Sequence, residues 1–215
     1  YFVESFSYHD DAWNHICPPS YTGNIRSWQT SFIYDANPGN AKPRNMYAFE
    51  YDALGRLKES KQYFEQNYSF TVADSMFAER GMRYDKNGNI QALKRYADRS
   101  LVDDFVYSYT GQGNKLASLY NAADNSSYGY DYDENGNCTV DGLNSLNLSY
   151  NSLNLIAGVS DASTSQPVAG YRWVADGIKA GATADNGNGL EYLGSLVYKN
   201  ENGALSLESA GFSNG

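Results

Sequence analysis

Side chains with oxygen atoms gather at one place in the chain, at a spacing that could bind calcium. They are Asp131, Asp133, Asn135, Thr139 and Asp141, with Gly136 among them. Oxygen ligands at alternate positions and a glycine at the sharp turn are features of a calcium loop. Gly142 stands at the twelfth position, where that loop needs a bidentate glutamate. A β-hairpin turn explains the same residues, so no metal site is predicted here.

Nucleophilic catalysis would need one of the only two histidines, His9 and His15. Cys17 follows His15 by two residues, so both side chains would lie on one face of an extended segment. A cysteine–histidine pair could act as a nucleophile, but no oxyanion motif accompanies it. We interpret these residues as parts of a loop that ends at Pro18 and Pro19. A two-histidine zinc site lacks further ligands nearby.

Adjacent acidic residues could serve glycoside hydrolysis, which uses two carboxyls at a defined separation in a cleft. The pairs are Asp10 with Asp11, Asp103 with Asp104, and Asp133 with Glu134. Acidic residues are so abundant here that their presence does not indicate a cleft. The stretch from Gly111 to Asn114 lacks the lysine and helix of a phosphate-binding loop, so it predicts a hairpin turn. We predict no catalytic, cofactor-binding or metal-binding residue, no cofactor, and no enzymatic activity.

The elements that would position these groups come from a repeated tyrosine-anchored motif. Its clear copies are FEYDALGRLKES at 49–60, MRYDKNGNIQAL at 82–93, YSYTGQGNKLASL at 107–119 and YDYDENGNCTV at 130–140. In each copy a tyrosine precedes a glycine by four residues. Trp173 and Gly177 keep this spacing, Tyr150 keeps it with Asn154, and VYKNENGALSL at 197–207 stretches it to five. A repeat with variable insertions is typical of an array of structural units.

Each motif predicts a β-hairpin. Aromatic residues alternate before the glycine and apolar residues resume after it, which gives one aromatic row per strand. Asparagine–glycine pairs such as Asn87-Gly88 and Asn135-Gly136 tolerate the positive φ of tight turns. The aspartate of each Tyr-Asp pair can accept backbone N–H groups. The predicted fold is all-β with little helix, and one or two helical turns are expected at Ala73–Arg80.

The tyrosine rows suggest two uses. Packing within the sheet is the favoured interpretation, since aromatic residues at strand spacing usually pack. The alternative is a carbohydrate-binding surface, in which exposed tyrosines together with Trp13, Trp28 or Trp173 stack on sugar rings.

The segments YDALGRL, YDKNGNI and YDYDENGN resemble the YD repeat of bacterial Rhs proteins, which also occurs in wall-associated and toxin-complex proteins. The similarity extends from YTGNI, beginning at Tyr21, to about Leu207. Together with the final YLGSLVYKNENGALSLE, the arrangement resembles the Rhs-type surface proteins of Bacteroidetes.

The resemblance implies consecutive antiparallel hairpins in a twisted, spiralling sheet that would form part of a shell. In full-length relatives such a shell encloses a C-terminal effector, often a toxin. This chain departs from that pattern because it is too short for a complete shell. Its five prolines also include none after aspartate, so the self-cleavage segment of those relatives is absent. The resemblance therefore implies a non-catalytic structural module of a cell-surface or secreted protein.

The expected organisation is one continuous domain. Residues 1–48 would form an N-terminal β segment with a degenerate repeat, 49–207 the repeat sheet and 208–215 a tail. We expect a fragment of a longer chain that is extracellular or attached to the cell envelope. Its partners would be other parts of that chain or a C-terminal effector, and exposed sheet edges would allow dimerisation.

Charge and cysteine content narrow the partners further. The formal net charge is −9, which disfavours nucleic acid because phosphate binding needs clustered lysine and arginine. No apolar run reaches membrane-spanning length. The two cysteines, Cys17 and Cys138, are far apart in sequence, and both a disulfide and two free thiols stay open.

Overall fold

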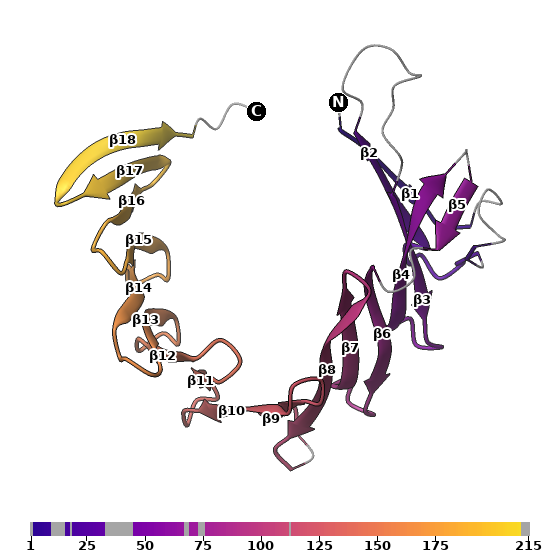
Figure 1. The fold of residues 1–215 in the computed structure, drawn as a ribbon. Helices are drawn as coiled ribbons and strands as arrows, with labels where there is room; N and C mark the ends of the chain where they lie inside the picture. The colour runs from indigo at the N-terminus through magenta and orange to yellow at the C-terminus, as the bar shows by residue number, and fades with distance from the viewer. Residues whose placement is uncertain are drawn as a thin grey trace. The chain divides into compact units, whose positions relative to one another are not determined.

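A computed structural model describes residues 2–9, 16–17, 19–32, 45–66, 69–72, 76–111 and 113–211. These residues form eighteen β-strands and no helix. They divide into two compact units, Tyr1–Ser127 and Tyr128–Gly215. The predicted all-β class with consecutive antiparallel hairpins is therefore confirmed (Figure 1).

Unit 1 is a meander in which each strand pairs with its neighbours in the chain (Figure 1). One exception is β4, which pairs with both β5 and β6. The strands are β1 (Phe2–Ser7), β2 (Ser27–Phe32), β3 (Asn45–Tyr51), β4 (Leu57–Gln66), β5 (Ser69–Val72), β6 (Phe77–Tyr84), β7 (Ile90–Ala97), β8 (Ser100–Tyr109) and β9 (Leu116–Asn121).

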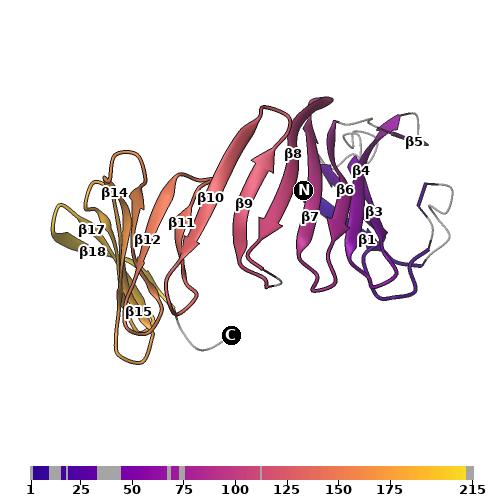
Figure 2. The same ribbon diagram turned by 90° about the horizontal axis from the view of Figure 1, so that it is seen from below.

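Unit 2 continues the same pattern with shorter strands, all paired antiparallel in chain order (Figure 2). They are β10 (Ser126–Tyr132), β11 (Cys138–Asp141), β12 (Leu146–Tyr150), β13 (Ile156–Asp161), β14 (Pro167–Trp173), β15 (Lys179–Ala184), β16 (Gly189–Leu193), β17 (Leu196–Glu201) and β18 (Ala204–Ala210). The boundary between the two units falls inside β10.

The buried core lies almost entirely in unit 1. Met46 and Ala48 of β3 are buried, together with Cys17 of the N-terminal segment. Of the described residues in unit 2, Gly181 alone is buried. Unit 2 is thus a single-layer sheet, which depends on its hydrogen-bond ladder and on half-buried side chains rather than on a packed interior.

The prediction of a helix at Ala73–Arg80 is wrong, because β6 begins at Phe77. Ala78 is buried at 4% exposure, and the Glu79 N–H donates to Ser60 Oγ at 3.2 Å. Two helical turns are unstable alone, and cross-strand pairing with β7 offers more contacts. Ala73 to Ser75 lie outside the described residues.

The motif turns differ in detail from a two-residue hairpin. In the turn after β3, Asp52 N–H donates to Arg56 O and Gly55 N–H donates to Asp52 O, leaving three residues in the loop. The glycine has φ +77°, as in a type I turn followed by a bulge. The turn after β6 repeats this geometry, with Gly88 at φ +89° while Asn87 is absent from the positive-φ residues. A two-residue turn with positive φ at both of its residues is found instead at Asn202 and Gly203.

Candidate functional site: repeat contacts and two grooves

The motif tyrosines link each hairpin to the one before it. In unit 1, Tyr84 Oη donates to Leu57 O at 2.6 Å and Tyr109 Oη donates to Ile90 O at 2.9 Å. Each acceptor is the first residue of the strand that follows a motif turn. Tyr51 Oη donates to Ile25 O at 2.6 Å. Because Ile25 ends the YTGNI segment, this degenerate first repeat takes the same structural role as the clear copies.

Unit 2 contains the same contact. Tyr150 Oη donates to Cys138 O at 2.8 Å, and Trp173 Nε1 donates to Ile156 O at 2.7 Å. The indole nitrogen therefore replaces the phenol oxygen. We call these two bonds, together with the three made by Tyr51, Tyr84 and Tyr109, the aromatic ladder. Each donor residue also stands at a register shift in its hairpin.

A second set of contacts joins neighbouring turns through the residue five positions after the motif tyrosine. In unit 1, Arg56 Nη1 donates to Asp85 O at 3.2 Å, and Asn89 Nδ2 donates to Gly113 O at 3.3 Å. In unit 2, Asn137 Nδ2 donates to Asn154 Oδ1 at 2.8 Å. The same side chains bind the aspartate of their own turn, so each one bridges two repeats.

The carboxylates of the motif aspartates accept hydrogen bonds within their own turns. Asp133, at the centre of the calcium-loop candidate, accepts both the backbone N–H and the side-chain Nδ2 of Asn137 at 2.8 Å. The side-chain bond from Asn137 holds the pKa of Asp133 below its usual value. A side-chain bond from Arg56 does the same for the pKa of Asp52. No group of three acidic, histidine or cysteine side chains that could hold a metal ion occurs within the described ranges.

The remaining acidic pairs also take part in local contacts. Asp103 forms an ion pair with Arg95 at 2.7 Å, and Asp104 forms one with Lys94 at 2.9 Å. These partners lie directly opposite on β7 and β8, as expected of cross-strand charge pairs. Asp10 and Asp11 lie outside the described residues.

The predicted turn at Gly111–Asn114 is present: Gly113 N–H donates to Thr110 O at 3.2 Å, and Thr110 N–H donates to Lys115 O at 2.9 Å. His15, the histidine of the cysteine–histidine pair considered from the sequence, lies outside the described residues, and so do Trp13 and Pro18. Cys17 is buried at 2% exposure, and neither it nor Cys138 forms a disulfide in the described part of the chain.

Unit 1 carries a groove of about 360 Å³ whose lining residues come from β2, β3, β4, β6 and β7. Its aromatic lining consists of Trp28, Tyr47, Phe49, Phe77 and Tyr96, and its polar lining of Ser60, Glu79 and Arg95. We call it the aromatic groove. The Trp28 and Tyr47 rings are stacked, with centroids 5.9 Å apart and an interplanar angle of 22°. Trp28 stands out in the sequence but the groove does not, because the register that places Trp28 opposite Tyr47 depends on long-range pairing.

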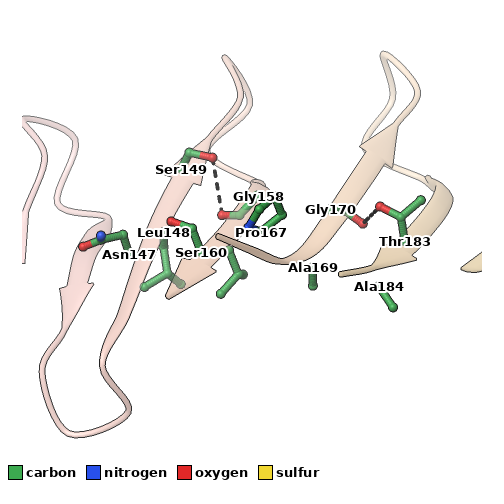
Figure 3. A pocket seen from close by; sticks show the side chains of 11 residues that line it. Asn147, Leu148, Ser149, Gly158, Ser160, Pro167, Ala169, Gly170, Thr183 and Ala184 are labelled. Atoms are coloured by element: carbon green, nitrogen blue, oxygen red, sulfur yellow. Dashed lines mark hydrogen bonds between the residues drawn. The ribbon is translucent and has the colours of Figure 1, made fainter. Parts of the chain in front are cut away.

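Unit 2 carries a groove of about 400 Å³ over β12 to β15 (Figure 3). Ser149, Gly158, Gly170 and Thr183 form one cross-strand row in it. Leu148, Ala169 and Ala184 point to the opposite side of the sheet from Ser149 (Figure 3). A Cβ atom at Gly170 would lie 2.7 Å from Thr183 Oγ1, so a larger residue at position 170 would force the Thr183 side chain to move. The groove follows from this row of small residues.

No protein-family model matches this chain, and no curated protein matches it. Two solved structures match 86% of the chain at 12% identity. They are a Photorhabdus luminescens Tc holotoxin pore carrying a TccC3 mutation, with a TM-score of 0.23, and a TcdB2–TccC3 crystal structure, with a TM-score of 0.26. The chain spans 16% of each of those chains. At these TM-scores the two matches carry no argument about function. None of the described residues forms a helix long and apolar enough to cross a membrane.

Proposed function

We propose that this chain is a non-catalytic structural and interaction module of a bacterial cell-surface or secreted protein of the YD-repeat type. Its partners are other parts of a longer chain or a C-terminal effector. The observation that carries the proposal is the use of the motif itself. Tyr84 binds the preceding repeat, Asp85 binds its own turn, and Asn89 binds the following turn. The polar groups that recur along the sequence hydrogen-bond to neighbouring repeats or to their own turn. This use supports a structural role for the motif rather than a catalytic one.

The resemblance of YDALGRL and YDKNGNI to YD repeats supports the same proposal. A sheet built from joined hairpins offers a broad surface against which another polypeptide can lie. In full-length relatives that polypeptide is an effector, and the sheet forms part of a shell.

Two experiments test this function. The purified chain is screened against glycosidase, peptidase and esterase substrates, with no turnover expected above that of a heat-denatured sample. Turnover that a single carboxylate substitution such as Asp103→Asn abolishes would overturn the non-catalytic assignment. In the longer protein that contains this chain, lysine cross-linking followed by mass spectrometry is expected to join Lys94 or Lys115 to a downstream region. Cross-links confined to this chain would contradict the proposed partner.

A second candidate function is a carbohydrate-binding surface module. The observation that favours it is the aromatic groove, because stacked, partly exposed rings beside polar side chains are suited to amphipathic ligands. A glycan array probed with the labelled chain tests this candidate, and binding to no glycan would count against it.

A further inference from the structure

We propose that the aromatic groove of unit 1 binds an uncharged oligosaccharide, laid across the strands from β2 to β7. This inference rests on the second candidate function and assigns its site and ligand class. It follows from the shape of the groove, from its flat apolar walls, and from the charges that its polar residues leave available.

A small residue creates the hollow. Phe49, Ser60 and Glu79 lie opposite one another on β3, β4 and β6, so their side chains share one face of the sheet. The Ser60 side chain is short and buried at 7% exposure, and it leaves space between its two larger neighbours. The groove crosses five strands, which at about 4.8 Å per strand spacing gives a length of roughly 19 Å. That length exceeds a single sugar ring and suits an oligomer.

The walls supply flat apolar surfaces. Trp28 and Tyr47 are stacked at one end, and Phe77, which is 50% exposed, lies on β6. Tyr96 of β7 also contributes to the lining, at the position opposite Ala78. The C–H faces of a sugar ring are apolar while its hydroxyls are polar, so such a ligand can stack on these walls and still bind polar groups at its rim.

The polar lining offers both an acceptor and a donor. Glu79 has no ion-pair partner among the described residues, although Arg95 lies directly opposite it. Arg95 is instead held by Asp103, with Nε at 2.8 Å and Nη2 at 2.7 Å from the same carboxylate oxygen. A hydroxyl group both donates and accepts, so it can bind the Glu79 carboxylate and the remaining N–H groups of Arg95.

The same charges select against charged ligands. A polyanion would meet the carboxylate of Glu79 and the net charge of −9 on the chain. A polycation would meet the Arg95 guanidinium, which lines the groove. An uncharged ligand meets neither repulsion.

The neighbouring row contains unsatisfied polar atoms. Trp28, Tyr47 and Gln62 lie opposite one another on β2, β3 and β4. Trp28 Nε1 and Gln62 Oε1 are buried without a hydrogen-bond partner among the described residues. A buried donor or acceptor without a partner costs free energy. A ligand hydroxyl that bonded to either atom would remove that cost.

The test measures binding of glycans to the chain and to four variants. A glycan array first identifies ligands, and isothermal titration then measures their affinity. Phe77→Ala removes an exposed wall and Glu79→Gln removes the carboxylate, so each should weaken binding about tenfold or more. Tyr120→Ala is the matched control, because Tyr120 is 39% exposed on β9 outside the groove. Its affinity should equal that of the original chain. Ser60→Thr narrows the hollow and should also weaken binding, and thermal unfolding confirms that every variant is folded.

Each outcome bears on the proposal. Binding of uncharged oligosaccharides that Phe77→Ala and Glu79→Gln weaken, with Tyr120→Ala unchanged, supports it. Binding that these variants do not affect overturns the groove assignment and leaves the carbohydrate function standing. Binding only to anionic polysaccharides overturns the ligand class. An array without any ligand overturns both the groove and the carbohydrate function. The structural proposal is tested independently by the substrate screen and the cross-links.

Discussion

The aromatic ladder predicts that the hydroxyl group of a single motif tyrosine contributes measurably to the stability of the fold. Tyr84→Phe removes only the hydroxyl that donates to Leu57 O at 2.6 Å and keeps the ring in place. The Arg56 guanidinium, 4.6 Å from the centre of that ring, keeps its contact. A hydrogen bond contributes about 0.5–1.5 kcal/mol net, and more when its loss leaves a partly buried carbonyl without a partner. Since Leu57 is half-buried, we expect the free energy of unfolding to fall by about 1–1.5 kcal/mol.

Urea denaturation followed by circular dichroism measures this change, with the slope of the transition compared between variants. Tyr120→Phe is the matched control, because the Tyr120 hydroxyl bonds to Asn125 Oδ1 at an exposed site, at 2.9 Å. It should change stability by less than about 0.5 kcal/mol. Hydrogen exchange adds a local readout, since the Tyr84 variant should lose protection first at β4 and β6. If Tyr84→Phe and Tyr120→Phe have the same small effect, the ladder does not join the repeats energetically and the reasoning is refuted.

Four further results are expected. Gly88→Ala should destabilise the chain by about 1–2 kcal/mol in urea denaturation, because Gly88 has φ +89° with open space around it, whereas Gly129→Ala, in extended backbone, should not. Gln62→Met should raise the melting temperature, because it removes the unsatisfied acceptor Gln62 Oε1, and a fall would contradict the burial argument. Acid should weaken the fold in a defined window: bonds from Ser163 and Thr164 lower the pKa of Asp161 from 3.8 to about 2, and bonds within the turn also lower the pKa of Asp133. A lowered folded-state pKa gives stability that is present above the unfolded value and lost as pH falls through the folded one, so melting temperature should drop below about pH 4 and keep falling toward pH 2. Asp161→Asn should flatten part of that drop, and an unchanged profile would count against this cause. Light scattering checks the predicted dimerisation through sheet edges, for which a strict monomer at all concentrations is the contrary result.

The repeat was readable from sequence because its residues have local roles. The tyrosine–glycine spacing identified the hairpins, and the placement of Asp52 and Asp133 in turns followed from short-range hydrogen bonding. The backbone conformation of Asn87 could not be predicted from the sequence. An asparagine–glycine pair fits both a two-residue turn and the three-residue turn found here. The segment VYKNENGALSL illustrates this. Its five-residue spacing gives a two-residue turn at Asn202-Gly203 instead of the motif turn.

The candidate site was harder to predict, since its residues come together through pairing between distant segments. Trp28 and Tyr47 meet only because β2 and β3 pair across residues 33–44. Glu79 reaches the groove because β6 pairs with β4 beyond the intervening β5. The helix candidate at Ala73–Arg80 failed for a related reason. A local pattern of helix-forming residues was overridden by strand partners that sequence alone does not place.

The aromatic ladder lies at one end of the strands only, where each hairpin has its motif turn. The connections at that end have nearly constant length. In unit 1 they are residues 52–56 between β3 and β4, 85–89 between β6 and β7, and 110–115 between β8 and β9. The opposite ends differ widely: Asp98 and Arg99 alone join β7 to β8, while β5 and its flanking residues intervene between β4 and β6. One margin of the sheet therefore sets the spacing of the repeats, and the other is free to accept insertions. New binding loops could be acquired along that second margin without disturbing the contacts that hold successive repeats together.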